Sequence, residues 1–222
     1  MSEQQYLVDY SGVSIISNET KLLNDINLVV SSGELVTIEG IVGAGKSTLL
    51  KSIYADRQIV DGKAEVLGFN LRKLPSRKIS KLRRQMGIIF QNFLLFDNKT
   101  VLDNLKFVID SVEFKVEGNV KDYIISVLEN VGLKDKADVF PHNLSGGERQ
   151  TVAIARAMVH KPKLILADEP TGNLDEESAL HIAQLLFEAT KSGAGVIVAT
   201  HDEPIFANFE HKIYKIKDGI LL

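Results

Sequence analysis

The chain has 222 residues, of which 45% are hydrophobic and 25% charged, as in an ordinary globular protein with a core of its own. The formal net charge is −3, so the chain as a whole is not basic, as nucleic-acid-binding proteins often are. The sequence has no cysteine, which excludes disulfides and thiolate metal sites. The N-terminus lacks a signal segment, and no apolar run approaches the roughly 20 residues that span a bilayer, so we expect a soluble protein that reaches a membrane only through another chain.

Short apolar segments alternate with helical patterns along much of the chain. Strands are predicted at 35–38, 64–67, 87–90, 164–167 and 195–199, and helices at 46–54, 120–131 and 176–191. This alternation predicts an α/β protein with a largely parallel sheet, preceded by a part made of strands and turns. No linker divides the chain, so we expect one domain, 1–222, with a helical subdomain of approximately 92–160 inserted in its core.

The first strand–helix junction carries a glycine-rich motif. Residues 40–48 read GIVGAGKST, which satisfies G-x-x-x-x-G-K-[ST] and predicts a P-loop NTPase. Backbone N–H groups and the positive end of the helix dipole converge on phosphate oxygens in such a loop. Lys46 is expected at the β- and γ-phosphates and Ser47 at Mg²⁺. The nucleotide-binding residues are then Gly40, Gly43, Ala44, Gly45, Lys46, Ser47 and Thr48.

Two adjacent carboxylates follow the strand at 164–167. Asp168 suits Mg²⁺, which prefers one or two carboxylates together with phosphate oxygens. Glu169 points to the other side of the strand end and is a candidate to accept a proton from an attacking water. An acidic pair after a strand is usually a solvated loop, but the P-loop upstream favours the catalytic interpretation.

A second candidate anion site lies at the start of another helix. Ser145, Gly146 and Gly147 place a hydroxyl and two glycines at a helix N-terminus, although an ordinary serine cap has the same pattern. Two phosphate sites about a hundred residues apart do not easily hold one nucleotide in one protomer. A two-fold homodimer formed on ATP binding resolves this, with each P-loop facing the partner's serine and glycines.

Six motifs in this order resemble the ABC-type ATPase domain. They are GIVGAGKST, Gln91 after a strand, LSGGERQ at 144–150, LILADEP at 164–170, Asn173-Leu174-Asp175 and His201. The resemblance covers nearly the whole chain. It implies a RecA-like parallel core sheet with an N-terminal antiparallel β part and the inserted helical subdomain.

The resemblance also implies roles for several residues. His201 is expected to contact the γ-phosphate, and Gln91 to sense Mg²⁺ and the attacking water and to connect the site to a membrane partner. Asp175 is expected in a loop that crosses the dimer interface. Ser145 and Gly147 are expected at the γ-phosphate bound by the other protomer. ATP and Mg²⁺ are the implied cofactors, with Ser47, Gln91 and Asp168 at the metal.

One position departs from the family pattern. The family usually places an aromatic residue near the end of the first strand to stack on adenine, and the aligned residue here is Ile16. Tyr10 lies nearby in the sequence. An aliphatic contact would hold the ring more weakly than an aromatic stack.

A basic run lies between the strands at 64–67 and 87–90. Its members are Arg72, Lys73, Arg77, Lys78, Lys81, Arg83 and Arg84, with no acidic residue between Leu71 and Gln85. A solvated helix face explains such a run, as does proximity to anionic headgroups or an acidic partner. No interleaved aromatic residues accompany it, so nucleic acid is not expected as a partner.

Within the family, residues 82–105 are similar to the compact branch of FtsE-type cell-division ATPases, LolD-type lipoprotein-release ATPases and MacB-type proteins. The chain as a whole most resembles the FtsE type. This implies an integral membrane partner similar to FtsX, control of cell-wall hydrolases, and a cytoplasmic location on the inner face of the membrane. An export role of the LolD or MacB type is the alternative, and a soluble ABC protein acting on nucleic acid or ribosomes is a third.

Overall fold

The computed structural model describes residues 6–17, 20–172, 174–201 and 203–222, and its two sheets confirm the α/β fold predicted above. The strands are β1 Val8–Ser17, β2 Thr20–Val30, β3 Leu35–Glu39, β4 Ile59–Val66, β5 Phe69–Asn70, β6 Met86–Ile89, β7 Leu164–Asp168, β8 Gly195–Thr200, β9 Lys212–Lys217 and β10 Ile220–Leu221. The helices are α1 Lys46–Ile53, α2 Ser76–Arg83, α3 Val101–Val112, α4 Val120–Asn130, α5 Gly146–Met158, α6 Glu176–Lys191 and α7 Glu203–Phe206. Three 3₁₀ turns join them, at Leu71–Lys73, Lys134–Lys136 and Pro141–Asn143.

The larger sheet contains the strands that precede the predicted motifs. Its order is β10-β9-β3-β8-β7-β6, and every neighbouring pair from β9 to β6 is parallel. Strands β3, β7 and β8 are buried along almost their whole length, as expected when helices cover both faces of a parallel sheet. Because parallel strands end at the same edge, the residues that follow β3, β6, β7 and β8 come together there.

The smaller sheet is antiparallel, in the order β2-β1-β4-β5. Strand β4 begins at Ile59, five residues before the predicted strand, and Gly62 lies inside it rather than at its boundary. A Cβ at Gly62 would lie 2.3 Å from the carbonyl oxygen of Gly12, opposite an irregular stretch of β1. Gly62 is therefore required because two strands approach closely there. From the sequence alone, such a glycine cannot be distinguished from one in a turn.

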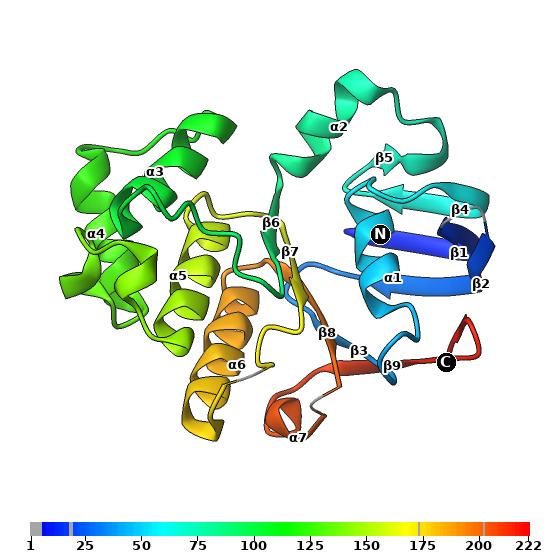
Figure 1. Ribbon diagram of the computed structural model, residues 1–222. Coiled ribbons are helices and arrows are strands. Elements are labelled where there is room, and N and C mark those ends of the chain that lie inside the picture. Colours follow the sequence, from blue (N-terminus) through cyan, green and yellow to red (C-terminus); the bar gives the residue numbers. More distant parts are fainter. Residues whose placement is uncertain (1–5, 18–19, 173, 202) are drawn as a thin grey trace.

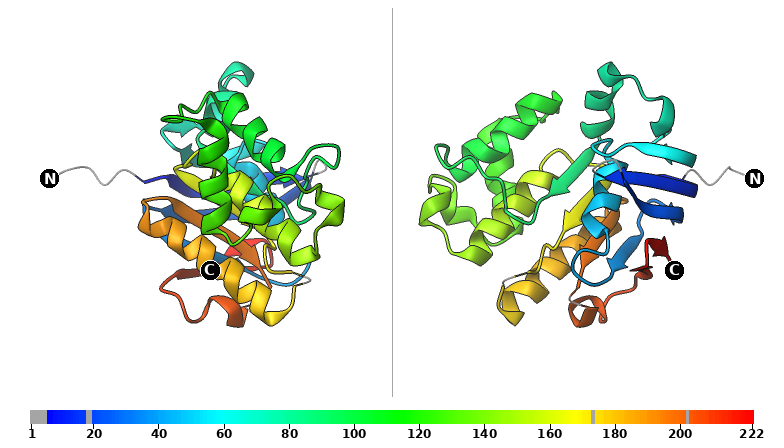
Figure 2. Two further views of the ribbon diagram at one scale, coloured as in Figure 1. Left: turned by 90° about the vertical axis from the view of Figure 1, so that its left-hand side faces the viewer. Right: turned by 45° about the vertical axis from the view of Figure 1, so that its right-hand side comes forward.

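Three buried clusters hold the molecule together. One lies between α1 and the two sheets, a second packs α6 and α7 on the larger sheet, and a third joins α3, α4 and α5. Figure 1 and Figure 2 show these last three helices at one end, the antiparallel sheet at the other and the larger sheet between them. None of the helices in the described ranges is long and apolar enough to cross a membrane.

The basic run is only partly engaged by the rest of the protein. Arg72 donates to the carbonyls of Val60 and Gly62, and Arg83 to those of Tyr54 and Ala55. Arg84 pairs with Glu113 at 3.1 Å. The remaining members, Lys73, Arg77, Lys78 and Lys81, are exposed to solvent.

Candidate active site

The loop between β3 and α1 has the backbone of a phosphate cradle. Gly43 and Gly45 have φ angles of 83° and 110°, in the left-handed region that favours glycine. A Cβ at Gly45 would also lie 2.8 Å from Cδ2 of Leu23, so β2 leaves no room for a side chain. Gly45 is the N-cap of α1 and no side chain caps that end, so its backbone N–H groups remain available to an anion.

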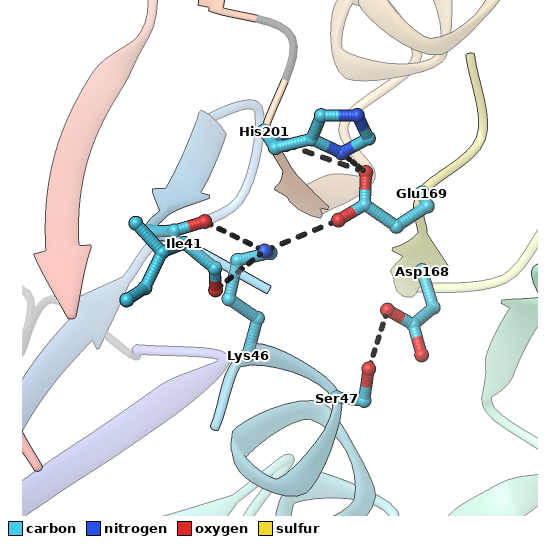
Figure 3. A network of polar contacts seen from close by, with 7 residues as sticks. Ile41, Lys46, Ser47, Asp168, Glu169 and His201 are labelled. Atoms are coloured by element: carbon cyan, nitrogen blue, oxygen red, sulfur yellow. Dashed lines mark hydrogen bonds and ion pairs between the residues drawn. The ribbon is translucent and has the colours of Figure 1, made fainter. Parts of the chain in front are cut away.

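Lys46 lies at the centre of a buried polar network (Figure 3). Its Nζ lies 3.2 Å from Oε1 of Glu169 and donates to the carbonyl of Gly40 at 2.7 Å. The other carboxylate oxygen, Oε2, lies 2.7 Å from Nδ1 of His201. The Glu169 side chain is 11% exposed and that of His201 is 56% exposed. Lys46, the predicted phosphate anchor, and His201, the predicted γ-phosphate contact, thus both lie against the carboxylate of Glu169, the predicted general base.

Glu169 itself has an unusual backbone. Its φ angle is 49°, in the left-handed region, and its N–H donates to the carbonyl of Ala199 at 2.8 Å. The peptide N–H of His201 also points at Oε2, at 3.3 Å. The end of β8 therefore fixes both the backbone and the carboxylate of Glu169, a strain typical of functional sites. No feature of the sequence predicted this conformation.

A hydroxyl and a carboxylate form a second polar pair beside this network. Ser47 donates to Oδ1 of Asp168 at 2.9 Å. Burial raises the pKa of the Asp168 carboxyl above its ordinary value, and the nearby Glu169 adds to the effect. A hydroxyl, one carboxylate and the amide of Gln91 are hard oxygen donors that suit Mg²⁺, whose remaining ligands are water and phosphate oxygens. The donor set fits the metal without a cluster of acidic residues.

A cavity of about 250 Å³ collects most of the predicted P-loop and catalytic residues, but Asp168 is not part of its lining. Its lining is Leu22, Val42, Gly43, Ala44, Gly45, Lys46, Ser47, Thr48, Gln91, Glu169 and His201. Leu22, from β2, was not among the predicted site residues, since an apolar residue within a strand carries no functional signal. Gly40 lines an adjoining apolar cavity of about 820 Å³, together with Ile41, Val42 and the β9–β10 hairpin.

The signature residues lie outside this cavity. Among the described residues that line it, none is Ser145, Gly146, Gly147 or Asp175. Ser145 is the N-cap of α5 and forms a capping box with Glu148, while Asp175 caps α6 and accepts from the Ser178 N–H at 2.9 Å. Both side chains thus have local structural roles. Asn173, from the same motif as Asp175, lies outside the described residues.

The structure excludes Tyr10, one of the two residues considered near adenine. Tyr10 is 1% exposed, and its hydroxyl lies 3.2 Å from Oγ of Ser52 in the core. Burial raises the pKa of its phenol. Tyr10 therefore cannot stack on a nucleotide. Ile16, near the end of β1, is only half-buried.

A family model described as ABC transporter matches residues 23–172, and the chain belongs to this family. It is an ATPase of the ABC type, whose cofactors are ATP and Mg²⁺. Among named relatives it is similar to the cell division ATP-binding protein FtsE of several bacteria. The identity is 40% over 202 residues for the protein of Streptococcus pneumoniae serotype 2 strain D39, covering 91% of this chain and 87% of the relative. It is 39% over 206 residues for that of Mycobacterium tuberculosis, covering 93% and 89%.

Solved structures agree with this assignment. The dimeric post-hydrolysis structure of the ATP-binding cassette MJ0796 with ADP and Pi has a TM-score of 0.85 and 32% identity, covering 96% of both chains. CbiO1 of Clostridium perfringens, part of the ABC transporter complex cbiONQ, has a TM-score of 0.86 and 29% identity, covering 98% of this chain and 87% of the other. The predicted family and enzyme class are confirmed.

Proposed function

We propose that this chain is the ATP-binding and ATP-hydrolysing subunit of a membrane complex in cell division. It works as a nucleotide-sandwich homodimer, at the inner face of the membrane, with an integral membrane partner of the FtsX type, and it transmits ATP-driven motion toward cell-wall hydrolases. The similarity to proteins named FtsE supports the biological role. We treat residues 1–222 as one ATPase domain with a helical subdomain at about 92–160.

One observation carries the proposed catalytic roles: a single cavity unites the P-loop, Gln91, Glu169 and His201, while Ser145 and its neighbours lie outside it. The cavity holds the Mg²⁺ and triphosphate of one ATP. The partner protomer supplies Ser145, Gly146 and Gly147 to the same nucleotide, and Asp175 lies in the loop between protomers. The ADP- and Pi-bound dimer of MJ0796 supports this arrangement.

The Lys46–Glu169 pair suggests how ATP prepares the site. The Lys46 ammonium lies 3.2 Å from a carboxylate oxygen of Glu169. The γ-phosphate is a stronger competitor for the ammonium because it carries more negative charge. A γ-phosphate in the cavity would therefore draw Lys46 away and leave Glu169 to accept a proton from the attacking water. Ser47, Asp168 and Gln91 would hold Mg²⁺, which would supply positive charge beside the phosphates.

His201 orients this carboxylate through its Nδ1 atom. The contact at 2.7 Å occupies Nδ1, so Nε2 would contact the γ-phosphate, as a donor when both ring nitrogens carry a proton. The side chain is more than half exposed, so its ring reaches the open part of the cavity. One imidazole then contacts both Glu169, which is the general base, and the phosphate that the water attacks.

A pull-down tests the biological part of the proposal. Tagged Glu169→Gln protein, held with ATP, is used to capture partners from detergent-solubilised membranes. Recovery of one membrane protein with few spans and a large outer domain supports the FtsX-type role. Recovery of paired lipoprotein-export subunits or a pump would instead indicate the LolD- or MacB-like alternative. Recovery of ribosomes or DNA without a membrane protein would contradict both.

A further inference from the structure

Arg156, on α5, is a buried cation with an unusual set of partners. It is 8% exposed, and no ion pair joins it to a carboxylate in the part of the chain that the structure describes. Its Nη1 donates to the carbonyl of Leu94 at 2.5 Å and its Nη2 to that of Phe93 at 2.8 Å. Burial removes water from the guanidinium and lowers its pKa. The two carbonyls compensate for this lost hydration.

The segment that Arg156 holds is strained. Phe93 and Leu94 have φ angles of 57° and 48°, and two consecutive non-glycine residues in the left-handed region are rare. The Phe93 N–H closes a turn by donating to the carbonyl of Phe90 at 3.1 Å. The Phe93 ring also lies 5.5 Å from the guanidinium of Arg149, again from α5. A strained conformation persists only where surrounding contacts enforce it, and α5 supplies them.

This turn contains Gln91. It follows β6, lines the phosphate cavity and is separated from Phe93 by a single residue. On the other side of the turn, Leu94 and Phe96 line an apolar groove of about 270 Å³ in which Arg156 also takes part. Asn104 ties down the far end of the segment by accepting from the Phe96 N–H at 2.8 Å. Arg156 thus lies between the groove and the loop that presents Gln91.

We propose that Arg156 is a positioning residue for ATP hydrolysis, which holds the turn at 90–94 so that Gln91 lies in the phosphate cavity. The inference rests on the proposed function in one respect, namely that Gln91 acts at the Mg²⁺ and the attacking water.

The test is a double-mutant cycle on the purified full-length chain, with Arg156→Met, Gln91→Ala and the double variant. ATPase kcat, the Mg²⁺ concentration at half-maximal rate and the affinity for a fluorescent ATP analogue are measured for each. Arg156→Met should lower kcat about tenfold to a hundredfold, the scale of an approximately 1 Å misplacement. It should raise the Mg²⁺ requirement and change nucleotide affinity by less than about threefold, since the P-loop is untouched. In the Gln91→Ala background it should have almost no further effect.

Arg156→Lys is the second variant and carries the same cycle if Arg156→Met does not fold. Lysine keeps the charge but lacks the planar fork that reaches both carbonyls, so we expect an intermediate kcat. Arg83→Met is the matched control. Arg83 also donates to two backbone carbonyls, and one belongs to Ala55, whose φ angle is 57°, but that contact lies at the end of α1. Its kcat should stay within about twofold of wild type.

Two outcomes would overturn the inference alone. One is an Arg156→Met protein with wild-type kcat and Mg²⁺ dependence. The other is a multiplicative combination with Gln91→Ala, which would mean a structural role only. A Gln91→Ala protein with wild-type turnover would instead remove the proposed role of Gln91, and the inference with it.

Discussion

At the scale of single residues, Glu169 is the side chain on which the site depends. It links Lys46 to His201, and its left-handed backbone is held by the end of β8. Glutamine has the same length and similar conformational preferences, so it retains this geometry while removing the basic oxygen. The substitution therefore separates the proton-accepting role from the structural one.

We predict that Glu169→Gln lowers the ATPase rate about a hundredfold or more, the usual effect of losing a general base. ATP affinity should be equal or higher, because Lys46 loses its competing carboxylate. Phosphate release and nucleotide titration measure the two effects. Glu188→Gln, on the exposed face of α6, is the control. Turnover at the wild-type rate would contradict the role assigned to Glu169.

Tyr10→Phe tests whether the aromatic residue inside the first strand is structural. Ser52 donates to the Leu49 carbonyl at 2.7 Å, so the Tyr10 hydroxyl is the donor in the Tyr10–Ser52 bond. Its removal should lower the free energy of unfolding by about 1 kcal/mol, as measured by urea denaturation. ATP affinity should not change. A loss of affinity without a loss of stability would place Tyr10 at the nucleotide after all.

The raised pKa of Tyr10 gives the same site a pH dependence. The folded state disfavours the phenolate, so the contribution of Tyr10 to stability is complete below the ordinary tyrosine pKa of about 10 and is lost as the pH rises above it. Tyr10→Phe should flatten the alkaline decline of the unfolding free energy. The comparison is made between the two proteins at each pH.

At the scale of elements, α5 combines two roles at its N-terminus. Ser145 accepts from the Glu148 N–H at 3.2 Å, and Glu148 accepts from the Ser145 N–H at 2.8 Å. This backbone hydrogen bond is the main reason why the pKa of Glu148 is lowered. The cap stabilises the helix in the isolated chain, whereas the proposed contact to ATP would require the partner. Stability and activity therefore respond differently to substitution.

We predict that Ser145→Ala lowers the free energy of unfolding by about 1 kcal/mol, whereas Ser145→Asp changes it little because aspartate also caps helices. Ser145→Asp should nevertheless abolish ATP-dependent dimerisation, since its carboxylate repels the γ-phosphate. Thermal unfolding and size-exclusion chromatography with ATP measure the two properties. A Ser145→Asp protein that dimerises normally would exclude a phosphate contact at Ser145.

Most strands of the larger sheet, the helices α1, α4 and α6 and the family motifs were predictable from the sequence, because buried β-strands, amphipathic helices and glycine-rich turns have local patterns. The helix at 176–191 and the strand that begins at 164 are present with those bounds. The position of Gly62 within β4, the burial of Tyr10 and the place of Leu22 in the cavity were not predictable. Each depends on the register between strands distant in sequence, and that register passes through bulges.

At the scale of the whole molecule, the arrangement predicts two incomplete sites per chain and two complete ones per dimer. Lys46→Ala removes the phosphate anchor, and Ser145→Asp removes the contact from the partner, so each variant alone should be inactive. A mixed dimer contains one site with both wild-type residues. The two substitutions should therefore complement one another.

We predict that an equimolar mixture of Lys46→Ala and Ser145→Asp proteins recovers up to about half of the wild-type ATPase rate. Neither variant forms an ATP-bound homodimer, so the dimers that form are mixed, and each has one intact site of two if the sites turn over independently. The rate is measured against each variant alone at the same total concentration. A mixture no more active than its components would contradict a site shared between protomers.

The rim of the P-loop has a further consequence. Ile41 and Val42 are 81% and 86% exposed, although both are branched and apolar. Both line the apolar cavity that adjoins the phosphate cradle. Any surface that covers this rim removes apolar area from water and gains roughly 25 cal/mol for each Å² that it hides. Closure over the nucleotide is thus favoured by solvent entropy as well as by charge, and it should weaken in the cold.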